Sequence, residues 1–401
     1  MAFFVPFFYS SIFMLLNSSS AKRRNKRLAV SAVFFAYGLT YASWASRIPG
    51  IQQSLALSDA ILGMVLFALP AGLFLCLPFS GWIINHFGSK KVVIFSCVVY
   101  TILLVLVGLS QSLLPLIIVL FVFGFFSNLL NIAVNTQAAG VEKLYNKPIM
   151  ASFHGMWSLA GFAGAAIGTL MMALNVQPFY HFIIIFLLMM GIIGLSASNM
   201  LITDVGRTTE GLKFVMPDKS LLKLGVIAFC SLICEGTMFD WSGIYFLKVV
   251  KAEPAWVGAG YTAYMIAMAS GRFLADWLSH KIGVQRMLQL SGTLTVFGLL
   301  IAVFFPYQVP AIIGFLIVGL GVSSVVPLAY SAASKSITMS PSLALSAVTT
   351  IGFFGLLVGP PIVGLIAGQS NLKTAFTFLI FMGLLVLGLS SIGKFETNLN
   401  K

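Results

Sequence analysis

Two carboxylates, Glu235 and Asp240, lie inside an apolar run from Leu221 to about Val249. That run is long enough to cross a bilayer as one helix. A carboxylate in a spanning helix is costly unless it faces a cavity or a partner, so it indicates a functional site. Because a low dielectric favours the uncharged carboxyl, we expect Glu235 to take up and release protons. We expect Asp240 to bind substrate, to close the outer gate or to share the proton coupling, with a structural ion pair as the alternative.

Three amides recur at helical spacing in another apolar run, at Asn128, Asn131 and Asn135. Residues three and four apart share one face of a helix. Amides suit ligands that are rich in hydroxyl groups. Hydrogen bonding between helices is the alternative, and the deeper Asn131 is the better candidate for a ligand role.

Aromatic side chains and one histidine complete the candidate site. Tyr41 and Trp44, in the outer half of the first apolar run, have rings that stack on a sugar or an aromatic ligand. For Trp44 the alternative is an interfacial aromatic belt. His154, with Trp157 one turn later, is suited to proton relay or substrate binding, and a structural histidine is the alternative. Trp241, directly after the second carboxylate, is a further expected substrate contact.

The composition indicates an all-α membrane protein. Hydrophobic residues make up 59% of the chain and charged residues only 8%, against about 25% charged in a soluble domain. The net charge of +13 comes from basic loops and does not indicate a nucleic-acid partner. The cysteines lie in apolar runs, which predicts buried thiols. Cys230 and Cys234 flank Glu235 without a nearby His, so we expect no metal or other cofactor.

From Leu28 the hydropathy pattern predicts twelve transmembrane helices. An even number places both termini on one side. Of the 23 lysines and arginines, 18 fall on that side, which predicts cytoplasmic termini. The expected spans are 28–48, 59–84, 91–110, 113–137, 149–173, 178–202, 221–247, 255–279, 287–304, 309–332, 343–368 and 372–393.

Pairs of matching residues separated by 195 positions, among them Gly88 and Gly283, indicate two homologous six-helix halves. Such halves, with a site between them, are a transporter architecture. The expected division is a basic tail at 1–27, halves at 28–202 and 221–393, a charged cytoplasmic linker at 203–220 and a C-terminal tail at 394–401. The apolar stretch at 3–16 precedes its basic residues, unlike a secretory signal, so we expect an interfacial or disordered tail.

The connection between the second and third spans, GWIINHFGSKK, resembles the signature loop G-x-x-x-D-R-x-G-R-R of the major facilitator superfamily. Asn85 and His86 depart from that pattern. A second copy keeps Gly283 and Arg286. Within the superfamily, the stretches at 42–47, 235–241 and 358–361 are similar to a bacterial subgroup related to rhizopine permeases.

This resemblance implies the major facilitator fold, with helices 1, 4, 7 and 10 lining a central cavity. It also implies a gating or structural role for the loop residues Gly81, Asn85, Gly88, Lys90, Lys91, Gly283 and Arg286. Arg272 is expected to pair with Asp276 one turn away. A counter-charge to Glu235, or an anion site, is the alternative for Arg272.

We therefore expect a secondary active transporter of a small polar solute, such as a sugar or inositol derivative, coupled to protons. Exporters of small metabolites or drugs are one alternative, and a non-transporting sensor or scaffold is another. The sequence has no nucleophile–base pair at recognisable spacing, which would indicate an enzyme. It also has no nucleotide-binding loop, which would indicate an ATP-driven pump. The expected location is the bacterial inner (plasma) membrane, with lipid, protons and a small substrate as partners and a monomeric chain.

The charge asymmetry predicts where the linker lies. A cysteine placed at Thr209 in a cysteine-free background should resist an impermeant thiol reagent in right-side-out cells. Ready labelling there would refute the orientation.

Overall fold

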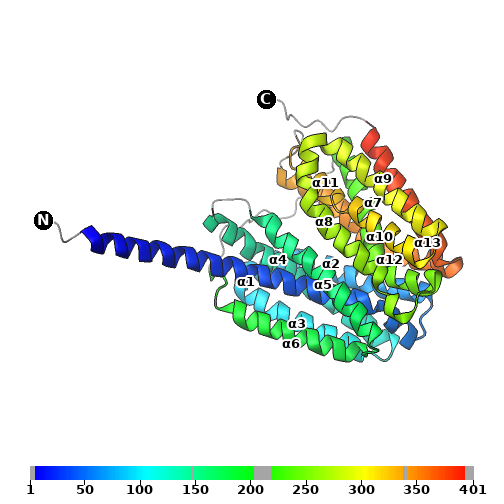
Figure 1. The fold of residues 1–401 in the computed structure, drawn as a ribbon, viewed down its shortest axis with the longest axis horizontal. Coiled ribbons are helices and arrows are strands. Elements are labelled where there is room, and N and C mark those ends of the chain that lie inside the picture. Colours follow the sequence, from blue (N-terminus) through cyan, green and yellow to red (C-terminus); the bar gives the residue numbers. More distant parts are fainter. Residues whose placement is uncertain (1–4, 146–148, 203–217, 337–338, 340, 393–401) are drawn as a thin grey trace.

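The chain folds into a bundle of helices (Figure 1). This computed structural model describes residues 5–145, 149–202, 218–336, 339 and 341–392. Nearly all of the expected linker and C-terminal tail lies outside the described residues. The first half contains α1 (Val5–Ser54), α2 (Asp59–Phe87), α3 (Ser89–Leu109), α4 (Leu113–Tyr145), α5 (Met150–Ala173) and α6 (Pro178–Ala197).

The second half begins with α7 (Lys219–Tyr245), which a π-helical turn, η1 (Phe246–Val250), continues. After the short 3-10 helix η2 (Pro254–Trp256) come α8 (Ala259–Ile282), α9 (Val284–Phe304), α10 (Gln308–Val322), α11 (Val325–Ala333), α12 (Pro341–Gln369) and α13 (Leu372–Ser391).

Eleven helices among the described residues are long and apolar enough to cross a membrane. The remaining expected span is α8, which packs in the bundle against α5 and α10 but whose tyrosines and Arg272 lower its mean hydropathy. One expected span, 309–332, divides into α10 and α11 at Ser323 and Ser324. Pro327 explains the break, because it has no N–H for the carbonyl of Ser323 and its ring clashes with that carbonyl.

The N-terminal tail is helical from Val5. Its residues belong to α1, which runs unbroken to Ser54, so the disordered alternative is wrong, whereas the interfacial alternative stays a prediction. Figure 1 shows this helix projecting from the bundle toward the N-terminus. No glycine or proline interrupts the stretch between Phe7 and Tyr37, and its arginines and lysines favour helix. The helix therefore runs through the basic residues without a break.

The two halves repeat one packing pattern. In the first half α1 packs on α5 and α6, α4 packs on α2 and α3, and α3 packs on α6. In the second half α7 packs on α12 and α13, α10 packs on α8 and α9, and α9 packs on α13. When α10 and α11 are counted together as the tenth span, each helix pair of the first half has its equivalent six spans later in the second half. The halves meet through α2 with α12 and α5 with α8, which are equivalent contacts. This confirms the expected duplication.

Close helix approach in both halves depends on glycines spaced four apart. On α5, Gly164 and Gly168 face α1, where a Cβ would meet Ala42 and Ser46. On α12, Gly355 faces the backbone of α7 at Phe229. Small residues let helices approach closely enough for dense packing without a hydrophobic driving force. The same contact is thus built twice.

Two loop glycines give the repeat a matching backbone conformation. Gly88 (φ 83°, ψ 141°) joins α2 to α3, and Gly283 (φ 85°, ψ 156°) joins α8 to α9. Each donates its N–H to the preceding helix, Gly88 to Ile84 at 2.8 Å and Gly283 to Ser279 at 2.9 Å. Only glycine adopts this region without strain. The signature loop therefore requires these residues for backbone geometry.

This geometry predicts opposite outcomes for two alanine substitutions. Gly88→Ala should destabilise the protein by about 1–3 kcal/mol, because a Cβ is strained at this φ. Gly81→Ala, in the interior of α2 where nothing lies within 4 Å of a new Cβ, should be neutral or stabilising by roughly 0.5–1 kcal/mol. Unfolding of the purified variants measures both, and equal effects would contradict the conformational explanation.

Candidate functional site

A cavity of about 1180 Å³ lies between the two halves. Its walls come from α1, α2, α4 and α5 on one side and from α7, α8, α11, α12 and the start of α9 on the other, with Ser323 between α10 and α11. The four helices expected to line it do so, with the α10–α11 pair as the tenth span, and α2, α5, α8, α9 and α12 join them. The cavity reaches the face that carries the chain termini, where Arg27, Ser279 and Lys335 line it.

Helix α7 presents one broad face to this cavity, formed by Leu232, Glu235, Gly236, Phe239 and Asp240. At 100° per residue these positions cover an arc of about 140° with the two carboxylates at its edges. The cavity therefore contacts both acids although they do not share a narrow face. Every one of these residues lies in regular helix.

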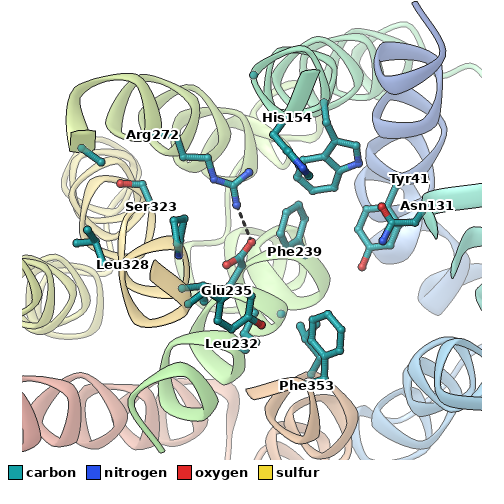
Figure 2. A pocket seen from close by; sticks show the side chains of 18 of the residues that line it. Tyr41, Asn131, His154, Leu232, Glu235, Phe239, Arg272, Ser323, Leu328 and Phe353 are labelled. Atoms are coloured by element: carbon teal, nitrogen blue, oxygen red, sulfur yellow. Dashed lines mark hydrogen bonds and ion pairs between the residues drawn. The ribbon is translucent and has the colours of Figure 1, made fainter. Parts of the chain in front are cut away.

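Glu235 forms an ion pair with Arg272 of α8, at 3.2 Å between Oε1 and Nη2 (Figure 2). The other terminal nitrogen of Arg272 donates to Ser158 Oγ on α5, in the other half, at 2.9 Å. Its guanidinium also lies over the Trp157 ring, 5.7 Å from the centroid. Arg272 thus acts as the counter-charge of Glu235, which was the alternative expectation. The side chain of Asp276, its expected partner, lies outside the described part.

Asp240 has no hydrogen bond or ion pair to any described residue. Its carboxyl lies near enough to the phenols of Tyr41 and Tyr261 to interact with both electrostatically. A carboxyl in such surroundings is stable when a proton or a bound group neutralises it. The two acids on α7 therefore differ in kind, because one has a counter-charge and the other does not.

Phe239 is the centre of an aromatic cluster that joins the halves. Its ring centroid lies 5.6 Å from that of Tyr41, 6.3 Å from Trp157, 5.9 Å from Tyr261 and 6.0 Å from Tyr264. Perpendicular contacts prevail, as expected for aromatic pairs. Sequence reasoning missed Phe239 and Ser158, because nothing in an apolar span marks which phenylalanine faces a cavity or which serine bonds to a charged residue of another helix.

The three amides on α4 do not act as one set. Asn131 lines the cavity, as Tyr41 does (Figure 2). Asn128 instead donates to the carbonyl of Leu73 on α2 at 3.2 Å. Asn135 donates to the side-chain oxygen of Asn131 at 2.9 Å. The expected ligand role of Asn128 and Asn135 thus gives way to contacts within the protein, because amides buried in a bundle bond to the nearest acceptor.

Of the aromatic and histidine candidates, all but Trp241 line the cavity. Tyr41, Trp44, His154 and Trp157 line the cavity. Trp44 is buried inside the protein, so it is not part of a lipid-facing belt. Trp241 is also buried but is not among the cavity residues, since it lies about 240° around α7 from Glu235. It belongs to the packed interior of its half, contrary to the expected substrate contact.

On the face opposite the termini, polar contacts hold the halves together. Lys248 Nζ lies 2.5 Å from Asp59 Oδ1, which also accepts a hydrogen bond from Gln52 at 2.7 Å. Nearby, the hydroxyls of Thr169 on α5 and Thr262 on α8 are 3.2 Å apart. The cavity is therefore closed at this face and reaches the other.

Breaking the Asp59–Lys248 pair should open this face more often. The pair is partly exposed, so it contributes roughly 0.2–1 kcal/mol. A cysteine at Tyr41 in a cysteine-free background should then react roughly 1.5- to 5-fold faster with an impermeant reagent applied from that face in Asp59→Asn. Lys373→Gln removes an exposed charge elsewhere on that face and should change nothing. Equal rates in both variants would show that the pair is not a closing contact.

Comparison with known proteins agrees with this architecture. The family model of the Major Facilitator Superfamily matches residues 28–342 and 254–394. An uncharacterized MFS-type transporter of Yersinia pestis is 32% identical over 352 residues, covering 88% of this chain and 91% of that protein. Membrane protein MosC of Rhizobium meliloti is 29% identical over 368 residues, covering 90% and 89%.

Solved structures share the fold at low sequence identity. The nucleoside transporter NupG matches with a TM-score of 0.73 and 13% identity, covering 92% of this chain and all of that chain (100%). A bacterial homolog of the human lysosomal transporter Spinster matches with a TM-score of 0.67 and 14% identity, covering 92% and 96%. With the family model matching most of its length, this chain belongs to the Major Facilitator Superfamily and is a multi-pass secondary transporter, not an enzyme.

Proposed function

We propose that this transporter couples the movement of a small polar solute to protons through Glu235. The observation that carries the proposal is the position of Arg272, which is bonded at once to Glu235 in its own half and to Ser158 in the other half. One cation thus connects the candidate proton carrier to the interface that must rearrange during transport.

The charge of Glu235 decides how Arg272 is held. While Glu235 is ionised, the two charges attract each other strongly in a low-dielectric site. A proton on Glu235 removes that attraction and leaves Arg272 with Ser158 and the Trp157 ring. Protonation therefore shifts Arg272 toward the N-terminal half. Alternating access needs such a change, because a ligand or proton moves an equilibrium only through a differential interaction with its two states.

Other titratable groups surround this pair. Tyr264 on α8 and Tyr330 on α11 interact electrostatically with Glu235. His154 on α5 faces the cavity and interacts with Arg272. A neutral imidazole at this position is suited to pass protons between the cavity and Glu235. His154 is thus proposed as a relay rather than as the carrier.

The substrate contacts come mainly from the N-terminal half. Tyr41, Trp44 and Trp157 offer ring faces, and Asn131 offers an amide to hydroxyl groups. The indole nitrogens of Trp44 and Trp157 have no hydrogen-bond partner among the described residues. Asp240 supplies a second acidic contact from the other half. Stacking faces beside polar groups favour a ring that bears hydroxyls, such as a sugar, an inositol derivative or a related polyol.

The orientation follows from the charge asymmetry of the loops. With cytoplasmic termini in a bacterial inner membrane, the cavity described here opens to the cytoplasm, and the Asp59–Lys248 pair closes the outer face. Rocking of the two halves then exposes the site to the other side. Release of that outer pair is part of this step.

Export of small metabolites or drugs is the second candidate. The cavity walls favour it in one respect, because phenylalanines such as Phe34, Phe239 and Phe353 contribute to them. Direction of flux separates the two functions: a symporter accumulates substrate when protons move inward, whereas an exporter exchanges substrate against them. A non-transporting sensor would show no substrate exchange in liposomes at all.

Glu235→Gln tests the coupling. The amide mimics the protonated carboxyl permanently, so the variant should still exchange substrate in counterflow without a gradient. It should lose accumulation driven by a pH gradient, because no change of charge then accompanies the cycle. Uptake into proteoliposomes with and without an imposed gradient measures both properties.

Asp240→Asn is the matched control on the same helix. It should weaken substrate binding more than it weakens coupling. Retained gradient-driven accumulation in Glu235→Gln would refute the proposal and move the proton site to Asp240 or His154. Loss of both accumulation and counterflow with a normally folded protein would indicate a binding role for Glu235 instead.

A further inference from the structure

Arg47, near the end of α1, is a buried cation without a carboxylate partner in the described part of the chain. Only 3% of its surface is exposed. Its Nη2 donates to the backbone carbonyl of Val176, in the connection between α5 and α6, while its Nε has no partner. A buried charge that lacks a counter-charge is costly. The proposed transport through the central cavity does not explain why Arg47 is buried without a counter-charge.

Arg47 lines a second cavity, of about 710 Å³, on the face opposite the termini. This cavity shares no residue with the central one. It lies among the ends of α1, α3 and α5, and the C-terminal half contributes apolar contacts such as Leu247 and Val257. Its other polar groups are amides and hydroxyls, on Gln53, Ser54, Ser110, Gln111, Asn175 and Gln177, with no acidic side chain among its residues.

The acids of this face do not neutralise Arg47. Asp59 is bonded to Lys248 and Gln52. Glu253 is exposed beside Pro254 at the rim and has no ion pair to a described residue. Arg47 has instead a second potential cation as neighbour, because the buried His181 interacts with it electrostatically. Neither ring nitrogen of His181 has a partner among the described residues.

We propose that this second cavity binds a small oxyanion, a carboxylate or a phosphate, through the Arg47 guanidinium. A planar guanidinium matches two oxygens of such a group, and the amides and hydroxyls around it supply neutral donors. The oxyanion belongs either to a free solute or to the headgroup of an anionic lipid. The site does not depend on the proposed proton coupling, and its occupant need not be transported.

A tethered carboxylate tests the site without any ligand. Gly50 lies one turn after Arg47, lines the same cavity and has no atom within 4 Å of an added Cβ. Gly50→Glu should therefore unfold at a higher temperature than its neutral match, Gly50→Gln. The difference should disappear when Arg47→Gln is added. A Glu variant no more stable than the Gln variant would overturn the proposal, even if Arg47→Gln alone fails to fold.

Free anions provide the second test. Inorganic phosphate and acetate, compared with chloride at matched ionic strength, should raise the unfolding temperature of the purified chain. Their apparent affinity should be about 10- to 100-fold weaker in Arg47→Gln, as for loss of a hydrogen bond to a charged group. It should be unchanged in Lys373→Gln, and Gly50→Glu should abolish the response. No stabilisation, or equal stabilisation in Arg47→Gln, would assign Arg47 only to holding the Val176 carbonyl.

A comparison of lipid vesicles shows whether the oxyanion comes from a lipid headgroup or from a free solute. Vesicles of phosphatidylcholine with and without phosphatidylglycerol are compared, with no added phosphate. Stabilisation by phosphatidylglycerol that requires Arg47 identifies a lipid headgroup. Stabilisation by free phosphate in pure phosphatidylcholine, again requiring Arg47, identifies a soluble anion. These outcomes leave the Glu235 experiment untouched, so the two proposals fail independently.

Discussion

The cost of placing charge in a low-dielectric interior governs this structure. Charged side chains are scarce, and two ion pairs within the described bundle offset the desolvation of their charges. Glu235 and Arg272 neutralise each other, and Asp59 and Lys248 do so at the closed face. Asp240 and Arg47 do not follow this pattern. An unpaired ionisable group is costly unless something else satisfies it, so we propose that these two mark the places where the protein meets protons or ligands.

The duplicated architecture places both ion pairs where the two halves meet. Equivalent helix pairs pack in each half, and glycines on α5 and α12 allow close approach at equivalent positions. The halves themselves meet through α2 with α12 and α5 with α8. The contacts between the halves combine helix packing with single polar bonds such as that of Arg272 with Ser158. We propose that transport opens these contacts.

Patterns along the chain predicted the fold nearly completely. Hydropathy alone located the spans, since a segment that crosses a bilayer must be apolar over about 20 residues. The repeat of Gly88 at Gly283 predicted the two halves, because a positive φ demands glycine in both copies. Hydropathy did not predict two features. These are the extension of α1 back to Val5 and the break in the tenth span at Pro327, and each depends on local helix chemistry.

The sequence by itself determined which residues are chemically unusual, among them Glu235, Asp240 and Asn131. Only the tertiary structure decided what each one contacts. Arg272 bonds to Glu235 and Ser158, on two other helices, and the sequence separations of 37 and 114 residues leave no local signal for such a pair. The same holds for Asn128 and Trp241, which turn into the packed interior. Periodicity fixes the face of a helix, but the neighbours of that face follow from how the helices pack.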